Sequence, residues 1–134
     1  MLELALSYGR GLVLLRDIAE RQSISIGYLE QIIPSLKAAG LVNSSRGARG
    51  GYTLAKSPAD ITLKEIISAL EGPLSLVECI KDPDTCERTD FCITRDVWNE
   101  LSDKMDDFLL SVTLQHMVEK HRRKQKSQPL MYSI

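Results

Sequence analysis

Apolar residues recur at helical spacing in two neighbouring stretches near the start of the chain. The first stripe consists of Leu14, Leu15, Ile18 and Ala19. After Ser23-Ile24-Ser25 interrupts the pattern, a second stripe consists of Ile26, Leu29, Ile32, Ile33 and Leu36. Ser25 is a good N-cap for this second helix, and Gly40 is a typical C-terminal stop. The pattern therefore predicts two helices joined by a tight turn.

A β-hairpin with a glycine-rich tip is expected directly after these helices. Residues 41–45 and 52–55 are strand candidates on either side of Arg46-Gly47-Ala48-Arg49-Gly50-Gly51, and glycine permits the positive φ angles of a hairpin tip. Helix, turn, helix and hairpin is the layout of a winged helix-turn-helix that reads duplex DNA. A helical hairpin without DNA binding shares the two helices. A phosphate-binding glycine loop joins a strand to a helix, and its Walker form needs Lys and Ser or Thr after the last glycine, which are absent here. We therefore favour the wing over a phosphate-binding loop.

The start of the second helix supplies the candidate base contacts, because that helix lies in the major groove in such a unit. The amide of Gln31 can bridge adenine N6 and N7, and Glu30 can accept a hydrogen bond from cytosine N4. The candidates for contact with bases or phosphates on this helix are Ser25, Gly27, Tyr28, Glu30 and Gln31. Arginines on a mobile glycine-rich tip suit a narrow minor groove. The candidates for phosphate or groove contact are Lys37, Arg46 and Arg49, with Arg16 as a further one.

Charge is distributed unevenly along the chain. Lys and Arg number seven against four Asp and Glu in residues 1–56, five against thirteen in 57–118, and five against one in 119–134. A net charge of −1 does not exclude DNA binding, because DNA phosphates are attracted by the positive charge of the surface that faces them and not by the net charge of the protein. We divide the chain into a DNA-binding unit (1–72), a cysteine-bearing loop (73–94), a dimerisation helix region (95–120) and a flexible tail (121–134).

A strongly amphipathic helix is predicted from Arg95 onward, after a shorter helix that begins at a Thr62–Glu65 capping box and ends before Gly72. A long helix that extends past a small domain typically pairs with its copy in a two-fold dimer, although packing against its own head is the alternative. Two heads would then read half-sites of a palindromic operator one helical turn apart. The candidate dimer-interface residues are Trp98, Leu101, Met105, Phe108, Leu109 and Val112. The expected fold class is mainly α with a small β-wing: a winged helix-turn-helix plus a long C-terminal dimerisation helix.

All three cysteines, Cys79, Cys86 and Cys92, lie in the irregular acidic stretch between those helices. Their odd number excludes a simple disulfide framework, and their C-x6-C-x5-C spacing is wider than that of a zinc knuckle. Thiolate ligation of an iron–sulfur cluster fits the pattern better. Zinc bound with the help of His116 or His121 is an alternative, as are three unligated thiols that act as small apolar residues or redox sensors.

Other function classes find no support along the chain. No nucleophile–base pair or paired-carboxylate constellation forms a recognisable motif, so we do not expect an enzyme. No stretch approaches the roughly 20 apolar residues of a membrane span. No basic segment precedes the first apolar run, so we expect a cytoplasmic protein without a membrane partner.

Several short runs together resemble the Rrf2 family of bacterial winged-helix regulators. They are DIAERQ (17–22), IS (24–25), YLEQ (28–31), AGLV (39–42), RG (46–47), GGY (50–52) and LEGP (70–73), with Trp98. The resemblance implies a homodimeric transcription regulator, a repressor of iron–sulfur cluster biogenesis or of sulfur and cysteine metabolism. It also implies one cluster per subunit, 2Fe–2S rather than 4Fe–4S, ligated by Cys79, Cys86 and Cys92. Loss of the ligand would then change the affinity for DNA.

This chain departs from the family where the fourth cluster ligand is expected. One branch has a His three residues after the last cysteine, and that position is Arg95 here, which cannot ligate. Other members take a carboxylate from the N-terminal helix of the partner subunit. About a dozen residues of that helix would precede Met1, and the first apolar run lacks a cap, so we expect a truncated chain.

The C-terminal residues 131–134 are similar to the tail of cysteine-metabolism repressors. Tyr132 and Ile134 are therefore candidates for docking into a cysteine synthase, whose pocket would capture the terminal carboxylate. A regulator without a cluster, controlled by this docking or by thiol redox, is the alternative to cluster sensing. A frayed, solvated end is the alternative for the tail itself.

Overall fold

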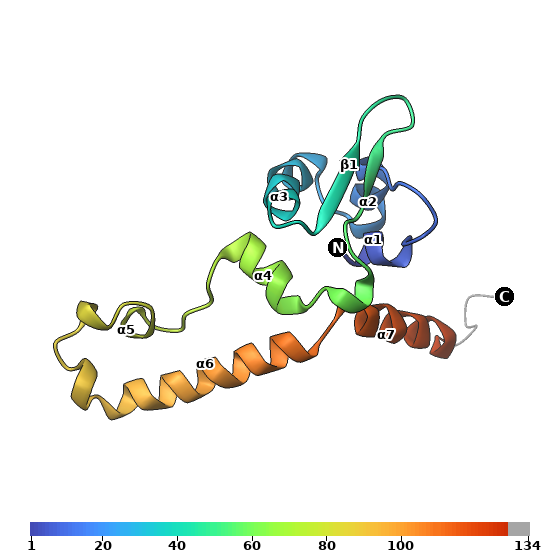
Figure 1. Ribbon diagram of the computed structural model, residues 1–134. Coiled ribbons are helices and arrows are strands. Elements are labelled where there is room, and N and C mark those ends of the chain that lie inside the picture. Colours follow the sequence, from blue (N-terminus) through green and yellow to red (C-terminus); the bar gives the residue numbers. More distant parts are fainter. Residues whose placement is uncertain (129–134) are drawn as a thin grey trace.

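The computed structural model describes residues 1–128, which form a winged-helix head, a projecting arm and a final helix that returns beneath the head (Figure 1). The head contains α1 (Leu2–Leu6), α2 (Leu15–Gln22), α3 (Ile26–Ala38), β1 (Val42–Ser45), β2 (Gly51–Leu54), η1 (Pro58–Asp60) and α4 (Leu63–Glu71). The arm contains α5 (Glu78–Lys81), η2 (Pro83–Thr85), η3 (Thr89–Phe91) and α6 (Ile93–Ser111), and α7 (Leu114–Ser127) follows. The predicted fold class, mainly α with a small β-wing, is confirmed.

Short-range hydrogen bonds define the two helices of the helix-turn-helix unit. Ser23 adopts a left-handed conformation with φ 54°, which ends α2. The Ser25 side chain accepts a hydrogen bond from the Tyr28 N–H at 3.1 Å, so the predicted N-cap of α3 is confirmed. Gly40 has φ 74° just beyond the end of α3, as expected for a glycine stop.

The wing is an antiparallel pair in which Val42 faces Leu54 and Ser45 faces Gly51. A further segment, not predicted from the sequence, joins this pair: Val13 and Tyr52 exchange two backbone hydrogen bonds of 2.8 Å. Glycine at position 51 permits this close approach, because a Cβ there would lie 2.8 Å from the Val13 carbonyl oxygen. The residues before α2 are thereby fixed to the base of the wing.

One apolar core holds the head together. Its buried members are Leu4, Ala5, Val13, Ile18, Ala19, Leu29, Ile33, Leu36, Leu41, Val42, Leu54, Ile61, Ile66, Leu114 and Val118. The predicted stripes were wrong at two positions, since Leu14 is 41 % exposed and Ile26 is 44 % exposed. Each stands at the start of its helix, on the side turned toward the wing, and lines a surface groove instead of the core.

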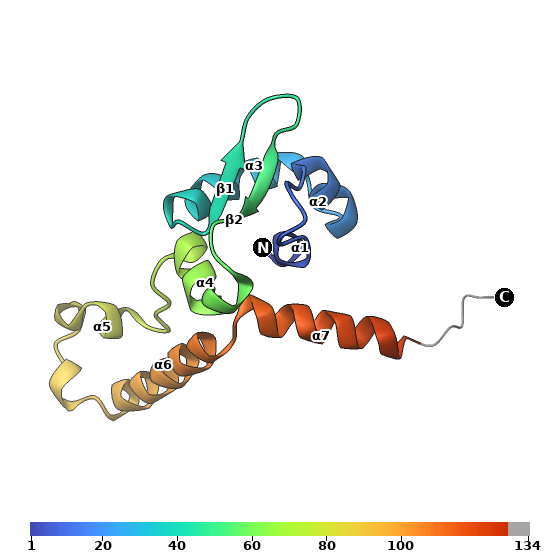
Figure 2. The same ribbon diagram turned by 45° about the vertical axis from the view of Figure 1, so that its right-hand side comes forward.

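The chain changes direction within residues 95–120, the range that the sequence assigned to the dimerisation helix region. The Leu63 N–H donates to the Val112 carbonyl oxygen and the Leu114 N–H donates to the Ile61 carbonyl oxygen, each at 2.9 Å. A short β-bridge between Thr62 and Thr113 thus separates α6 from α7. The predicted region 95–120 is therefore two helices of different direction (Figures 1 and 2).

Helix α7 packs into the head rather than extending the arm. A capping box of Thr113 and His116 begins it, and Leu114 and Val118 are almost fully buried in the core. The helix continues to Ser127, so residues 121–127 are helical where the sequence predicted a flexible tail. Leu114 and Val118, four positions apart, face the core together and hold the first turns of α7 against the head. In the described residues, no helix has the length and apolar character needed to span a bilayer.

Candidate nucleic-acid interface

A groove separates the exposed side of α3 from the wing. Its volume is about 560 Å³, and it is lined by the start of α2, by one flank of α3 and by both strands with their connecting loop. The residues are Leu14, Leu15, Arg16, Ile26, Glu30, Lys37, Ser44, Ser45, Arg46, Gly47, Gly50, Gly51 and Tyr52. The groove therefore combines three cationic side chains with backbone of the glycine-rich tip.

The cations of the groove are available for a ligand. Among the side chains that the structure describes, the ion pairs are Glu3–Arg21, Lys56–Glu65 and Lys64–Asp106. None of these pairs uses Arg16, Lys37 or Arg46, which are all exposed. Exposed cations on both walls of a groove attract an anionic chain such as a phosphate backbone.

The residues predicted to contact DNA are all exposed, and the structure brings some of them together. They are Ser25, Gly27, Tyr28, Glu30, Gln31, Lys37, Arg46 and Arg49. Glu30, Lys37 and Arg46 line the groove, whereas Gln31 and Gly27 lie on the exposed surface of α3 outside its lining. Ser25 uses its hydroxyl oxygen to cap α3, which gives it a structural part as well.

The two exposed apolar residues of the lining were missed by sequence reasoning. Periodicity placed Leu14 and Ile26 in the core, but both line the groove. Their position at a helix start could have indicated exposure, because the first residue of an apolar stripe can lie beyond the edge of the core.

The three cysteines are spread along the arm, from α5 to the residue before α6. Cys79 is in α5, Cys86 follows η2, and Cys92 directly precedes α6. Within residues 1–128 no three His, Cys, Asp or Glu side chains are grouped so that they could hold a metal ion. Thiols are suitable donors for an iron–sulfur cluster, but the arrangement in this structure does not form a site for one.

Two contacts organise the thiol next to α6. Cys92 Sγ lies 2.9 Å from Thr94 Oγ1, and this hydroxyl, together with the backbone N–H of Arg95, lowers the pKa of the Cys92 thiol. Arg95 Nε donates a hydrogen bond to the Cys79 carbonyl oxygen at 3.3 Å, which ties α5 to the start of α6. Arg95 therefore links two cysteine-bearing segments through its side chain and backbone.

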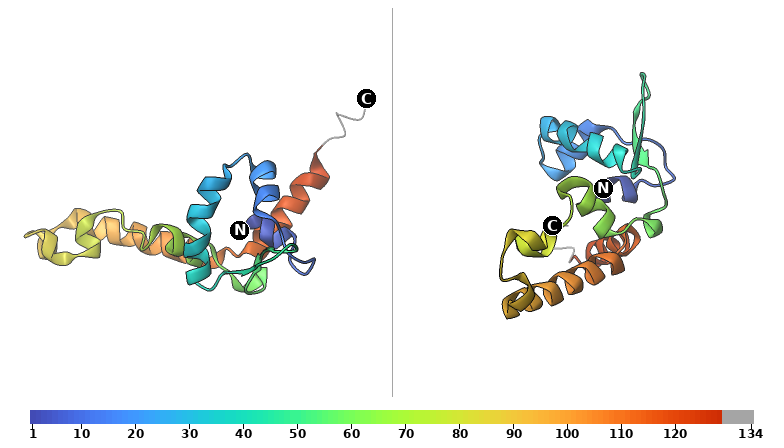
Figure 3. Two further views of the ribbon diagram at one scale, coloured as in Figure 1. Left: turned by 90° about the horizontal axis from the view of Figure 1, so that it is seen from above. Right: turned by 60° about the vertical axis from the view of Figure 1, so that its left-hand side comes forward.

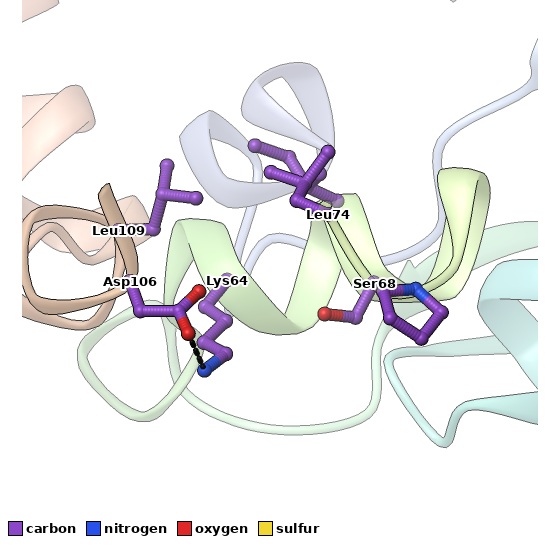
Figure 4. A pocket seen from close by; sticks show the side chains of 7 residues that line it. Lys64, Ser68, Leu74, Asp106 and Leu109 are labelled. Atoms are coloured by element: carbon purple, nitrogen blue, oxygen red, sulfur yellow. Dashed lines mark ion pairs between the residues drawn. The ribbon is translucent and has the colours of Figure 1, made fainter. Parts of the chain in front are cut away.

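Helix α6 packs one side against α4 and leaves an apolar side uncovered. Leu109 lines a cavity of about 400 Å³ with residues of α4 and of the segment that follows it, and Lys64 Nζ lies 3.2 Å from Asp106 Oδ2 beside it (Figure 4). The backbone of Val112 pairs with Leu63. The side chains left exposed on α6 include Val97, Trp98, Leu101 and Phe108, at 58 %, 40 %, 42 % and 63 %. Of the six residues predicted for the dimer interface, Leu109 and Val112 thus contact the chain's own head, and Met105 is half-buried.

The helix-turn-helix, its glycine-tipped wing and the cationic groove between them define a winged-helix DNA-binding protein. The family model of the Rrf2 iron-dependent transcriptional regulators matches residues 1–120. The chain belongs to the Rrf2 family, and it is a DNA-binding transcriptional regulator rather than an enzyme.

Relatives and solved structures agree with this assignment. The chain is 44 % identical over 119 residues to an HTH-type transcriptional regulator of Neisseria meningitidis, covering 89 % of this chain and 80 % of that protein. It is 42 % identical over 118 residues to the regulator IscR of Escherichia coli, covering 88 % of this chain and 72 % of IscR. Its structure is similar to that of IscR from T. potens, with a TM-score of 0.77, 40 % identity, and coverage of 98 % and 86 % of the two chains. For CymR, the global cysteine regulator of B. subtilis, these values are 0.74, 39 %, 89 % and 87 %.

The two tail residues predicted to dock a cysteine synthase, Tyr132 and Ile134, lie outside the described residues. Their docking stays a prediction.

Proposed function

We propose that the protein is a repressor that grips one operator half-site between α3 and the wing. The observation that carries this proposal is the groove, whose cations Arg16, Lys37 and Arg46 are exposed and outside every ion pair of residues 1–128. A DNA strand that passes between a major-groove helix and a minor-groove wing presents its phosphates to such a groove. Arg46 and Arg49 stand on the tip that would enter the minor groove.

Base preference would come from the exposed surface of α3. Gln31 can form a bidentate contact with adenine, and Glu30, on the groove side, can accept a hydrogen bond from cytosine. Each bidentate contact discriminates between bases by about 1–3 kcal/mol. These two residues are therefore the proposed readers, whereas Lys37 and the wing arginines set affinity.

The uncovered side of α6 supports a two-fold dimer. Val97, Leu101 and Phe108 recur on one side of this helix, and all three are exposed in the single chain. A second copy would cover them and would carry a second head, so that the dimer could bind a palindromic operator. Seen from above, α6 extends away from the head (Figure 3), where a copy can reach it.

Sensing is proposed to reside in the cysteine-bearing loop (73–94) at the end of α6. Three thiols occur there and nowhere else in the chain, and several of the relatives are IscR proteins. Cys79, Cys86 and Cys92 are the residues that would hold an iron–sulfur cluster, which would supply a redox-active centre in this loop. The loop is connected to the helix of the proposed dimer interface, because Arg95 Nε donates a hydrogen bond to the Cys79 carbonyl oxygen at 3.3 Å.

DNA binding is tested with duplexes that the purified protein selects from a random library. Affinity for the selected site is measured by fluorescence anisotropy at fixed salt for the wild-type chain, Arg46→Ala and Gln31→Ala. We expect Arg46→Ala to weaken binding to all sequences and Gln31→Ala to relax preference at one base pair. Unchanged affinity and unchanged preference in both variants would reject the assigned face.

Cluster binding is tested by anaerobic purification with absorption spectra and analysis of iron, sulfide and zinc. We expect visible absorption with iron and sulfide, lost in each single Cys→Ala variant at positions 79, 86 and 92. Stoichiometric zinc without sulfide would reject the cluster in favour of a zinc site. Metal-free protein whose DNA affinity is unchanged after mild oxidation would reject both cluster sensing and thiol redox sensing.

A further inference from the structure

Two large apolar side chains lie in the cationic groove where a nucleic-acid ligand would contact them. Leu14 is 41 % exposed and Ile26 is 44 % exposed, and both line the groove together with Arg16, Lys37 and Arg46. A ligand that covers these side chains removes apolar surface from water, which favours its binding. The groove therefore suits a ligand with an anionic backbone and at least one apolar group.

The backbone holds both side chains in defined positions. Ile26 is the first residue of α3, directly after the N-cap residue Ser25. Leu14 directly precedes α2 and follows Val13, which is fixed to Tyr52 of the wing by two hydrogen bonds of 2.8 Å. Gly27, the next residue, has no side chain, and a Cβ placed on it would meet no atom within 4 Å. Together with the 44 % exposure of Ile26, this leaves the first turn of α3 open to a ligand.

Duplex DNA offers one apolar group on the base edges of its major groove, the C5 methyl of thymine. The first residues of a recognition helix are the ones that reach base edges. We infer that Ile26 reads a thymine methyl group in the operator, with Leu14 completing the apolar surface on the α2 side of the groove. The inference rests on the proposed DNA interface and adds a specificity element to it, alongside the polar contacts of Gln31 and Glu30.

The test removes the methyl group alone. In the operator selected by the protein, each thymine is replaced in turn by deoxyuridine, which keeps every hydrogen-bonding group of the base pair. Affinity is measured by anisotropy at fixed salt for the wild-type chain, Ile26→Ala, Leu14→Ala and the control Leu70→Ala. Leu70 is a matched control because it is similarly exposed, at 37 %, but lies on α4 outside the groove.

For the wild-type chain we expect deoxyuridine at one thymine of each half-site to weaken binding about fourfold, as for one buried methyl group. The same replacement should have no effect on Ile26→Ala and a reduced effect on Leu14→Ala, and Leu70→Ala should behave as the wild type. Ile26→Val, which keeps a branched side chain, should retain most of the sensitivity.

Three results would overturn the inference. The first is a wild-type affinity that no deoxyuridine replacement changes. The second is a sensitivity that persists at full size in Ile26→Ala. The third is a loss in Ile26→Ala that is equal for thymine and deoxyuridine operators, which would make Ile26 a general contact. If Arg46→Ala and Gln31→Ala also bind as the wild type does, the proposed interface fails as well, so the two failures are distinguishable.

Discussion

The wing arginine Arg46 allows a quantitative test of the groove through the salt dependence of DNA binding. Each head places three cations in the groove, Arg16, Lys37 and Arg46, so a dimer would neutralise about six phosphates. At a slope of about −0.9 per phosphate, log K should fall with log salt with a slope of about −5. Between 50 and 200 mM salt the wild-type affinity would then fall on the order of 10³-fold.

Replacing Arg46 by Ala removes two of those contacts from a dimer. We expect the slope to become shallower by about 2, so that the same salt increase costs on the order of 10²-fold. Fluorescence anisotropy of the selected operator over a salt series measures both slopes. Arg122→Ala is the matched control, because Arg122 is an exposed arginine of α7, which lies beneath the head away from the wing (Figure 1). Equal slopes for the wild type and Arg46→Ala, or an equal change in Arg122→Ala, would refute the reasoning.

Further predictions concern the arm, the core, the thiol and the tail. Phe108→Asp should convert dimers to monomers, measured by sedimentation at micromolar concentration. Leu110→Asp is the control and should leave the dimer intact, because Leu110 is exposed on a different side of α6. A wild-type chain that is already monomeric would contradict the proposed dimer. Leu114→Ala should lower the free energy of unfolding by about 2–5 kcal/mol in urea titrations, because Leu114 is fully buried, and a cost as small as that of Leu110→Ala would contradict the docking of α7. Thr94→Val should raise the pKa of the Cys92 thiol toward its ordinary value, because it removes the hydroxyl that lowers this pKa. The pH profile of Cys92 alkylation in metal-free protein should then move to higher pH. An unchanged profile would mean that the hydroxyl has no effect on the thiol. Deleting Ile134 should abolish calorimetric binding to the organism's cysteine synthase, and equal binding, or none by the full chain, would reject the tail prediction.

Features that depend on neighbours within a few residues could be predicted from the sequence. The cap at Ser25, the Thr62–Glu65 box and the glycine stop at Gly40 are all present in the structure. Each requires only a side chain and a backbone group within about one helical turn. The glycine-tipped wing belongs to this group too, because turn chemistry and strand alternation are local.

Tertiary contacts decided which apolar residues are covered. Periodicity marks one side of a helix but not how far the neighbouring elements extend along it, so it could not show that Leu14 and Ile26 lie beyond the core. In the same way it could not show that Leu109 packs against α4 while Phe108 stays exposed.

The sequence by itself determined the winged helix-turn-helix, the exposed polar side of α3, and the clustering of the cysteines in one loop. Only the tertiary structure decided the groove, because Val13 and Tyr52, which bring the start of α2 to the wing, are far apart in sequence. The same holds for the turn between α6 and α7, which depends on pairing between Thr62 and Thr113. Such pairings depend on how separate elements pack in three dimensions, so they cannot be predicted from local residue patterns.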